Sequence, residues 1–448
     1  MAALTRPAAL RRLAAVAAVL LSLANAPAQT PSPALASAEG APVATGSGGV
    51  NAPVHRGKPS VVLISVDGFR ADYLDRSDVP NVRRVLERGA RAAALIPVFP
   101  TLTFPNHYSL VTGLRPDRHG LVSNVFFDPG RQQVYSLRDP AAVGDGTWYR
   151  GEPIWITAER QGMVAACYFW PGSEAAIGGI RPTRWARYDG AVPNAERVDT
   201  VLEWLGLPDD TRPRMITLYL SDVDAASHRH QLGTESVSTA IRAVDAALGR
   251  LLDGLAALPA RGQVFIVLTS DHGMTETSVS QMVAIDRLID MTGVRLPAGG
   301  PVASLHVDGG PGRARAVRDA LNRNLTHGRA YVRGEVPARL HYRADPRIGD
   351  VVVIMDEGFR IDRAEAIARI TRKEPMGMHG WDPALPSMHG IFAVMGPGVR
   401  AGARIPAVEN VDVYPFLAEV LGLVPAPDLD GRPGLIREQV MAPAAAGR

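Results

Sequence analysis

The sequence predicts an α/β protein in which helices flank a mostly parallel β-sheet, with a small α+β lobe inserted into the chain. Apolar, strand-like runs at 61–66, 215–220 and 264–269 alternate with helix-like segments, the order typical of a parallel sheet covered by helices. Each of these runs is also followed directly by acidic or histidine residues. Open α/β sheets bind their ligands at the carboxyl ends of the strands, so the same runs predict a functional site.

One helix is predicted at 79–88, after the first strand, and a longer one at 235–257, between the second and third strands. The longer segment repeats apolar side chains at helical spacing, at Val237, Ile241, Val244, Ala247, Leu248, Leu251, Leu252 and Leu255. A helix placed between two strands allows the second strand to run parallel to the first. We therefore expect 215–220, 235–257 and 264–269 to form one strand–helix–strand unit.

Residues 276–375 interrupt this alternation and carry no candidate metal-binding cluster. We expect them to form the inserted lobe, with one helix and two short strands at 312–324, 338–342 and 350–355. The main sheet and its helices are then expected to resume at 391–395 and 411–420. The principal domain is predicted to span 60–430, followed by a C-terminal tail at 431–448.

Residues 1–28 are typical of a signal peptide. Three arginines (Arg6, Arg11 and Arg12) precede an apolar run at 13–24, and Ala26-Pro27-Ala28 offers a small-x-small cleavage site. The apolar run is about a dozen residues, shorter than the roughly 20 that span a membrane, which disfavours the alternative of a retained anchor helix. We expect an exported protein, periplasmic or secreted from a bacterium, with a disordered linker at 29–59 that is rich in Ala, Pro, Ser and Gly.

Charge and cysteine content exclude some classes of function. The formal net charge is +3, and loss of the three leader arginines leaves the chain close to neutral. No basic stripe indicates a nucleic-acid binding surface. Cys167 is the only cysteine and lies in an apolar run, so no internal disulfide can form. The sequence predicts no stable membrane span once the leader is removed, and it does not predict the oligomeric state.

Acids and histidines at the strand ends predict a metal site. Asp67 follows the first strand, Asp224 and His228 follow the second, and Asp271 and His272 follow the third. Histidine nitrogens and carboxylate oxygens are the usual zinc ligands where thiolates are absent. Asp224 and His228 are four residues apart, which places them on one face of a helical turn, although a surface ion pair also explains that spacing. A metal-dependent hydrolase is the first hypothesis.

A second signal lies at 100–113, where Thr103 precedes a helix-like segment with Pro105 in its first turn. Threonine is a favoured N-cap residue, which is a purely structural explanation. The same position also suits a nucleophile, because the positive end of a helix dipole attracts phosphate. A divalent ion bound to the hydroxyl would make its proton easier to lose.

Seven motifs occur in the order in which one known family carries them. They are SVDGFR at 65–70, PTLTFPNHYSLVTG at 100–113, HGLVSNVFFD at 119–128, WPGSEA at 170–175, DAASH at 224–228, SDHGM at 270–274, and HGWD with SMHGIFAVMGPGV at 379–399. The chain resembles the nucleotide pyrophosphatase/phosphodiesterase family of the alkaline phosphatase superfamily. The resemblance covers residues from about 60 to 400 and implies an alkaline-phosphatase-like fold for the catalytic domain at 60–430.

The resemblance implies two zinc ions in each chain and a threonine nucleophile, Thr103. One zinc site would be formed by Asp67, Thr103, Asp271 and His272, and the other by Asp224, His228 and His379. Asp222 and His230 flank the second set but do not match the family spacing, and Ser227 stands where the family usually has glycine. His389 repeats the Met-His-Gly context of His379 and is interpreted as structural, and His107 and His119 as hydrogen-bonding scaffold.

The resemblance also assigns substrate contacts. The Asn124 amide and the Phe104 backbone N–H would donate to a phosphoryl oxygen, where charge develops in the transition state. Phe104 and Tyr188 would stack on a nucleobase, although Asn124 could be a turn residue and Tyr188 an ordinary packing residue. The expected substrate is a nucleotide or another small phosphodiester.

The expected activity is hydrolysis of nucleotide phosphodiester and pyrophosphate bonds through a phosphothreonine intermediate, which releases nucleoside 5′-monophosphates. Lys58 and Lys373 are the only lysines and neither lies in a site motif, which favours a diester over a monoester substrate. The alternative is a phosphodiesterase for choline-type lipid headgroups, which would need an aromatic and acidic cage. A catalytically inactive binding protein is the alternative from another class, and a sulfatase is disfavoured because residue 103 is threonine.

Overall fold

The computed structural model describes residues 46–259 and 261–442. The signal peptide predicted at 1–28 lies outside the described residues, as do positions 29–45 of the predicted linker and 443–448 of the predicted tail. None of the helices in the described part of the chain is long and apolar enough to cross a membrane.

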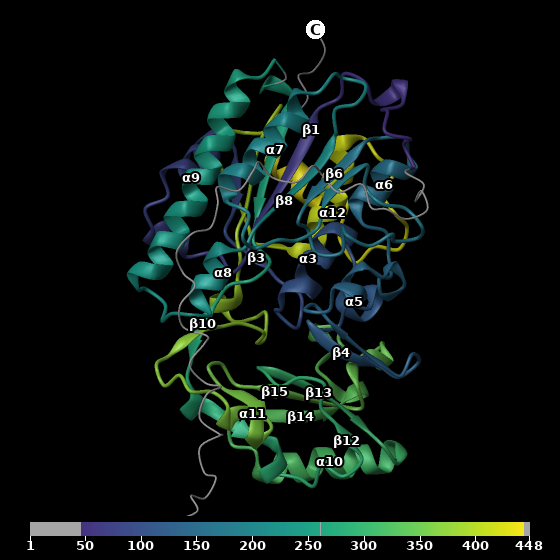
Figure 1. The fold of residues 1–448 in the computed structure, drawn as a ribbon, viewed down its shortest axis with the longest axis vertical. Helices are drawn as coiled ribbons and strands as arrows, with labels where there is room; N and C mark the ends of the chain where they lie inside the picture. The colour runs from purple at the N-terminus through teal and green to yellow at the C-terminus, as the bar shows by residue number, and fades with distance from the viewer. Residues whose placement is uncertain (1–45, 260, 443–448) are drawn as a thin grey trace, which may run out of the picture. The chain divides into compact units, whose positions relative to one another are not determined.

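A mixed sheet of eight strands forms the centre of the main domain (Figure 1). In spatial order its strands are β19 (Ala403–Ile405), β2 (Ala90–Ala92), β18 (Phe392–Met395), β9 (Val264–Thr269), β1 (Ser60–Val66), β8 (Met215–Leu220), β6 (Ala165–Tyr168) and β7 (Arg184–Ala186). All neighbours are parallel except those of β18, which is antiparallel to β2 and β9. The predicted α/β fold with a mostly parallel sheet is therefore confirmed.

The three predicted strands that are followed by acidic or histidine residues are adjacent in this sheet. β9 and β8 pair with the two edges of β1. Because all three run in the same direction, their carboxyl ends meet at one edge of the sheet. The fold thus brings together side chains that are about 200 residues apart in the chain, as for Asp67 and Asp271.

Helices cover both faces of the sheet, and the alternation of side chains along β1 divides the core in two. Val61 and Leu63 belong to one hydrophobic core, and Val62 and Ile64 belong to the other. The first face is covered by α3 (Thr103–Thr112), α6 (Ile154–Arg160) and α12 (Val413–Leu421), and the second by α2 (Pro80–Arg88), α7 (Asn194–Gly206) and α9 (Glu235–Ala257). Every residue of β1 is buried, which explains its continuous apolar sequence.

Helix α9 has the bounds predicted from its apolar spacing, and it also fixes the start of α2. Val79, at the N-terminal end of α2, has no side-chain acceptor for the free N–H groups of the first turn. Asp245 of α9 takes that role, because its carboxylate accepts from the backbone N–H groups of Asn81 at 3.0 Å and Val82 at 2.8 Å.

Short helices and two-stranded pairs connect these elements. They are α1 (Tyr73–Arg76), α4 (Pro116–His119), α5 (Pro140–Gly144), α8 (Asp222–Ser227) and α13 (Leu435–Val440), with the pairs β3 (Leu95–Ile96) and β20 (Val408–Glu409), β4 (Val125–Asp128) and β5 (Gln133–Ser136), and β10 (Thr275–Thr277) and β17 (Met376–Met378). The antiparallel pair β10–β17 is the stem of the inserted lobe, because the lobe lies between these two strands in the chain.

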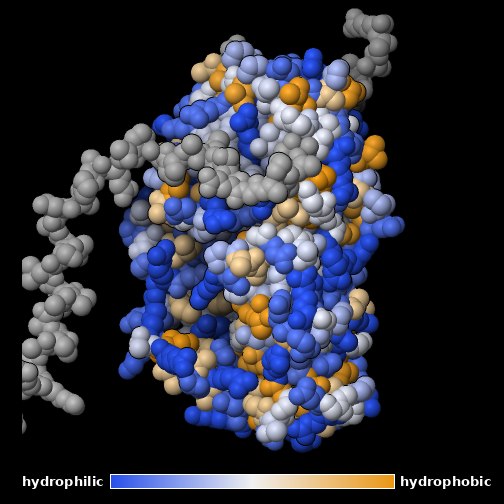
Figure 2. Space-filling view, turned by 45° about the vertical axis from the view of Figure 1, so that its right-hand side comes forward, coloured by the Kyte–Doolittle hydropathy of each residue, from blue (hydrophilic) through white to orange (hydrophobic). Residues whose placement is uncertain are grey.

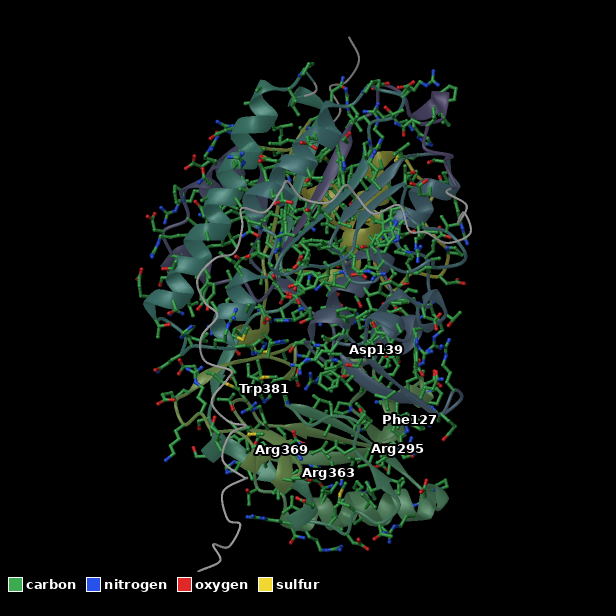
Figure 3. All side chains as sticks on the ribbon, viewed as in Figure 1. Phe127, Asp139, Arg295, Arg363, Arg369 and Trp381 are labelled. Carbon is green, nitrogen blue, oxygen red and sulfur yellow. The ribbon has the colours of Figure 1, made fainter. Side chains whose placement is uncertain are left out.

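The lobe has its own antiparallel sheet and its own hydrophobic core. The sheet order is β12 (Val294–Arg295), β13 (Val302–Val307), β15 (Val351–Met355) and β14 (Gly328–Val332), with α10 (Gly310–Asn324), β11 (Met282–Ala284), β16 (Arg360–Asp362) and α11 (Ala364–Ala368) beside it. Arg295 joins the lobe to β4, because its guanidinium lies 3.8 Å from the ring centroid of Phe127 (Figure 3). Arg347 makes a second connection by donating to Asp128 at 2.8 Å.

Most of the later elements occur where the sequence predicts them, with one exception. The segment 391–395 is β18, 411–420 falls in a short turn followed by α12, and 312–324 falls within α10. The strand predicted at 338–342 is wrong, because residues Ala338–Leu340 form a 3-10 turn. Leu340 and Tyr342 are buried between more exposed neighbours, which imitates the alternation of a strand, but the segment pairs with no other described strand.

Packed structure extends beyond both predicted ends of the main domain. Asn51 lies in the predicted linker, yet its side chain is buried and donates to the carbonyl oxygens of Asp209 and Arg212. The disorder expected for 29–59 therefore does not apply to residues 46–59. At the other end, Ile436 and Val440 of α13 are buried, so the predicted tail is part of the core up to that helix.

The surface retains few large apolar side chains. The face shown in Figure 2 is largely hydrophilic, with hydrophobic residues scattered over it. Among the described residues, the exposed large hydrophobic side chains are Val50, Val54, Val134, Tyr188 and Val424. Tyr188 is the aromatic member of this set, and it lines the cavity described below.

Candidate metal centre

Two carboxylates and one histidine form a buried cluster, the inner cluster, at the ends of β1 and β9. Asp67, Asp271 and His272 place one ligand atom each within 4.8 Å of one another. His272 Nε2 lies 2.9 Å from Asp271 Oδ2 and 3.4 Å from Asp67 Oδ1. Gly68 has a φ of +68°, which lets the chain turn directly after Asp67, and its N–H donates to Asp271 Oδ1 at 3.2 Å.

Asp224, His228 and His379 form a second cluster, the outer cluster, next to the first. Asp224 Oδ1 lies 3.2 Å from His228 Nε2 and 3.6 Å from His379 Nε2, and the two histidine Nε2 atoms are 3.2 Å apart. Asp224 lies in α8 directly after β8, His228 lies at the end of that helix, and His379 follows β17. The rings of His379 and His272 stack with centroids 3.5 Å apart, which connects the two clusters.

The polar atoms of both clusters are arranged for a cation. Asp67 Oδ1, Asp224 Oδ1 and Asp271 Oδ2 are buried and accept no hydrogen bond from the described residues. In each of His228, His272 and His379, Nδ1 lies within 3.0 Å of a backbone carbonyl oxygen, so Nδ1 donates to that oxygen and Nε2 faces the cluster. Lone pairs of nitrogen and oxygen that face each other at these distances repel unless a positive charge lies between them.

The pKa shifts of the acids and histidines in the two clusters also indicate a site for positive charge. Burial and the neighbouring carboxylates of Asp271 and Asp224 raise the pKa of Asp67 well above its usual range. Burial would also raise the pKa of Asp271, but His272 and His107 outweigh it and hold that pKa well below its usual range. Burial and the nearby His272 lower the pKa of His379 to about 3. The N and O donor set with no thiolate fits zinc.

Thr103 begins α3 and reaches the inner cluster. Its Oγ1 lies 3.4 Å from His272 Nε2. The loop before it is held by the buried side chain of Asn106, which accepts from the N–H of Val98 and donates to the carbonyl oxygens of Pro100 and Leu102. The hydroxyl is therefore fixed at the positive end of the helix dipole and beside the metal-ligand set.

Asn124 lies beside the start of the same helix. Its Oδ1 accepts from the backbone N–H of Phe104 at 2.9 Å. The Phe104 N–H, expected as a donor to substrate, is therefore bonded to Asn124 in this structure. That bond directs the Asn124 amide NH₂ away from Phe104, which leaves the NH₂ as the donor available to a ligand.

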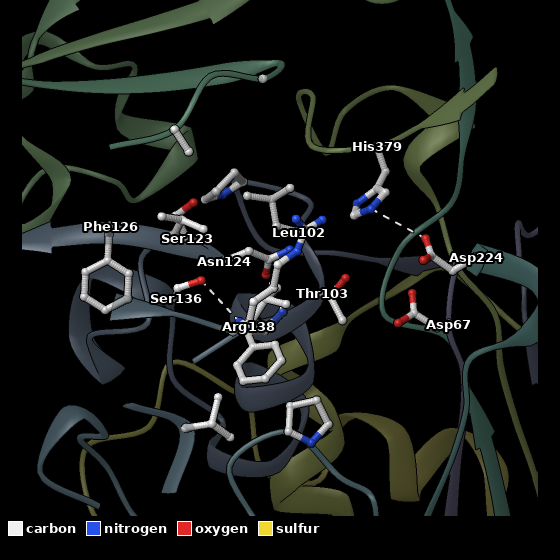
Figure 4. A pocket seen from close by; sticks show the side chains of 18 of the residues that line it. Asp67, Leu102, Thr103, Ser123, Asn124, Phe126, Ser136, Arg138, Asp224 and His379 are labelled. Atoms are coloured by element: carbon white, nitrogen blue, oxygen red, sulfur yellow. Dashed lines mark hydrogen bonds and ion pairs between the residues drawn. The ribbon is translucent and has the colours of Figure 1, made fainter. Parts of the chain in front are cut away.

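One cavity of about 660 Å³ joins these groups. Its lining includes Thr103, Asn124, Asp67, Asp224 and His379, which face one another in Figure 4, together with Phe104, Tyr188 and His228. The size is typical of a pocket for a small molecule. The Tyr188 hydroxyl donates to Ser221 Oγ at 3.2 Å, and its ring contacts Phe169 edge-on at 5.4 Å, so the ring is held in place while its exposed part borders the cavity.

The other histidines and acids considered from the sequence have other hydrogen-bond partners, although His107 Nδ1 also lies 3.3 Å from Asp271 Oδ2. His107 bridges Ser65 and the carbonyl oxygen of Thr103, and His119 contacts Ser109 at 2.9 Å. His389 contacts the carbonyl oxygen of Pro383, His230 is exposed, and Asp222 accepts from Asn194. These side chains are in neither cluster.

The structure adds residues that sequence reasoning did not find. The buried hydroxyl of Tyr219 donates to Asp67 Oδ2 and orients that carboxylate. Arg138 and the lobe segment 297–302 line the cavity. Tyr219 lies inside the apolar run of β8, where an aromatic side chain is already explained by core packing, so no pattern in the sequence marked it.

The sheet, the two clusters at its carboxyl edge and the threonine at the start of α3 define a protein of the alkaline phosphatase superfamily. Comparisons with known proteins narrow this class. Residues 61–382 match the sequence model of the family described as type I phosphodiesterase/nucleotide pyrophosphatase. The chain belongs to this family.

Individual relatives agree with this assignment. Mouse ectonucleotide pyrophosphatase/phosphodiesterase family member 1 is 36% identical over 381 residues, which are 83% of this chain and 41% of that protein. The bis(5′-adenosyl)-triphosphatase of Xenopus laevis is 34% identical over 379 residues, which are 84% of this chain and 80% of that protein. The chain thus spans about two fifths of the length of the mouse relative.

A solved structure shows the same fold. It is an inactive threonine-to-alanine variant of murine ectonucleotide pyrophosphatase/phosphodiesterase 5 in complex with AMP. This chain is similar to it with a TM-score of 0.79 and 30% sequence identity, and the match covers 86% of this chain and 100% of the other.

Proposed function

We propose that this protein hydrolyses nucleotide phosphodiester and pyrophosphate bonds with two bound zinc ions and releases nucleoside 5′-monophosphates. The observation that carries the proposal is the position of Thr103, whose Oγ1 lies 3.4 Å from His272 Nε2 at the start of a helix. A nucleophile, a helix N-terminus and two sets of unpartnered carboxylate oxygens converge on one cavity. That combination suits attack on phosphorus.

The residues of the two clusters would hold the zinc ions. Asp67, Thr103, Asp271 and His272 would bind one ion, and Asp224, His228 and His379 the other. When bound, such ions lower the pKa of hydroxyl and water oxygens and neutralise phosphate charge. The Nδ1–carbonyl contacts of the three histidines would hold their rings in place.

Thr103 Oγ would attack the phosphorus of the substrate, and the bond from phosphorus to the leaving oxygen would break. The product of this step is a phosphothreonine that carries the nucleotide. Water would then attack the same phosphorus and release the nucleoside 5′-monophosphate and the free threonine hydroxyl. Two in-line displacements give net retention of configuration at phosphorus. The Asn124 amide NH₂ would donate to a phosphoryl oxygen as charge develops there.

Phe104 and Tyr188 would bind the nucleobase by stacking. Both line the cavity, and stacking on an aromatic face does not distinguish one base from another, so we expect little base preference. The AMP complex of the murine relative and the names of the relatives above support a nucleotide rather than a choline-type headgroup. The ratio of kcat/KM for a nitrophenyl nucleotide ester over nitrophenyl phosphocholine tests this choice, and a ratio below one would reverse it.

The test of the mechanism is Thr103→Ala, with Thr103→Ser as its matched control. We expect the alanine variant to lose several orders of magnitude in kcat, because loss of a covalent nucleophile removes the reaction path itself. The serine variant keeps a hydroxyl and should keep part of the activity. Zinc content should persist in both, because the other six ligands remain. Turnover at the wild-type rate by Thr103→Ala would refute the nucleophile.

A further inference from the structure

The hairpin β4–β5 holds a cationic residue next to Asn124. Val125 pairs with Ser136 in this hairpin, and the N–H of Leu137 donates to the carbonyl oxygen of Asn124 at 3.0 Å. The next residue is Arg138, whose own N–H donates to Ser136 Oγ at 3.2 Å. The backbone of Arg138 is therefore fixed directly beside that of Asn124.

Arg138 is an exposed residue at the border of the cavity, and its guanidinium has no partner among the described residues. Arg138 lines the same cavity as Thr103 and Asn124, and Figure 4 shows its side chain extending between these two residues. Among the described residues, no hydrogen bond or ion pair is found for its guanidinium, in contrast to Arg347. The Arg347 guanidinium, which also lines the cavity, donates to Asp128 and to the carbonyl oxygens of Gly120 and Trp148.

The acids around the cavity do not neutralise Arg138. Asp67 and Asp224 belong to the two clusters, and on the view of Figure 4 they lie on the opposite side of Thr103. Glu174 accepts from the N–H of Tyr188 at 2.9 Å and lies 3.7 Å from the Arg187 guanidinium. A guanidinium left free beside a phosphate site is suited to bind an anion through charge-assisted hydrogen bonds.

We propose that Arg138 binds a second phosphate group of the substrate, the one adjacent to the phosphate that Thr103 attacks. The attacked phosphate already meets the two clusters and Asn124, whereas on the view of Figure 4 Arg138 lies across Thr103 from Asp67 and Asp224. The inference rests on the proposed function and specifies its substrate class. Arg138 would make the protein prefer nucleotides with a phosphoanhydride, such as nucleoside triphosphates, over nucleotide esters with an uncharged leaving group.

The experiment compares two substrates that share one nucleoside. Thymidine 5′-triphosphate carries the second phosphate, and the nitrophenyl ester of thymidine 5′-monophosphate does not. In Arg138→Gln we expect kcat/KM for the triphosphate to fall at least about tenfold, because the loss of one charge-assisted hydrogen bond has an effect of this size. The kcat/KM for the ester should change less than about threefold. Arg88→Gln is the control, because Arg88 is exposed, does not line the cavity and carries the same charge.

Other results would contradict either the role of Arg138 or the proposed function on which it rests. An equal loss for both substrates would overturn the proposal, because Arg138 would then act on the attacked phosphate. Unchanged kcat/KM for both substrates in Arg138→Gln would also overturn the proposal. So would an equal loss of kcat/KM for the triphosphate in Arg88→Gln, because long-range attraction by net charge would then explain the effect. Failure of the proposed function would instead appear as wild-type protein that hydrolyses neither substrate.

Discussion

The inner and outer clusters contain similar ligands but differ in how the fold holds them. The side chains of Asp67, Asp271 and His272 are at most 2% exposed, and all three lie within three residues of the end of a central strand. In the outer cluster, the side chain of Asp224 is 18% exposed and that of His228 is 31% exposed. Its third member, His379, follows the stem of the lobe. The inner cluster is thus fixed by the sheet, whereas the outer cluster depends on a short helix and on the lobe's attachment.

Replacing one histidine in each cluster should give the largest difference in zinc content and activity between the two clusters. His272 belongs to the inner cluster, and its ligand atom also lies within 4.8 Å of ligand atoms of Asp224 and His379. We therefore expect His272→Ala to lose most of the bound zinc and about 10³-fold or more of the activity. His228→Ala removes one partly exposed residue of the outer cluster and should keep the zinc of the inner cluster. Zinc per chain, measured after dialysis in metal-free buffer, gives the comparison.

His389→Ala is the matched control for these variants, because His389 shares the sequence context of His379 but contacts the carbonyl oxygen of Pro383. It should keep both zinc ions. If His228→Ala and His272→Ala lost the same amount of zinc, the two clusters would behave as a single unit and the difference in burial would have no consequence.

Metal removal from the unaltered protein should proceed in two phases. A chelator reaches the partly exposed outer cluster more easily, so we expect one zinc equivalent to leave faster than the other by about tenfold or more. Activity should fall with the first phase, because the proposed reaction needs both ions. The measurement follows released zinc and residual activity over time, and a single phase for both would contradict the expected order.

The smallest effects should come from residues that support one ligand each. Tyr219→Phe removes the donor to Asp67, and Gly377→Ala places a Cβ 2.9 Å from Ser227 Cβ and disturbs the carbonyl oxygen that contacts His228. Each should weaken zinc binding about 10- to 100-fold at its own cluster and leave the other unchanged. Competition with a zinc-binding dye, measured separately for the fast and slow phases of zinc release, gives the zinc affinity of each cluster. It tests whether each substitution weakens zinc binding at only one cluster.

The sequence predicts the inner part of the molecule better than its periphery. The strands 215–220 and 264–269 have the predicted bounds, because a fully buried parallel strand is a continuous apolar run that ends at a polar residue. Five of the proposed ligands follow from the same rule, because Asp67, Asp224, His228, Asp271 and His272 come after strand ends in the chain itself. The other two, Thr103 and His379, are implied only by the family resemblance. The α9 helix is equally well predicted by its apolar spacing.

Features that depend on neighbours far along the chain could not be predicted in this way. Arg138 becomes part of the cavity because Leu137 bonds to Asn124, and Asn51 becomes buried because its amide meets carbonyl groups near residue 210. Leu340 and Tyr342 have the alternating burial of a strand without a strand to pair with among the described residues. Burial patterns report which face of a segment is covered but not what covers it.

The two-stranded stem of the lobe has a consequence for protein engineering. Thr277 and Met376 are paired across β10 and β17, so the two points where the lobe leaves and rejoins the main domain are neighbours. A lobe from another family member could be joined at these two positions without stretching the backbone. Such a chimera would keep His379, which lies beyond the junction, but would exchange the 297–302 wall of the cavity. New substrate preferences could therefore be introduced as one block of sequence while every residue proposed as a metal ligand stays in place.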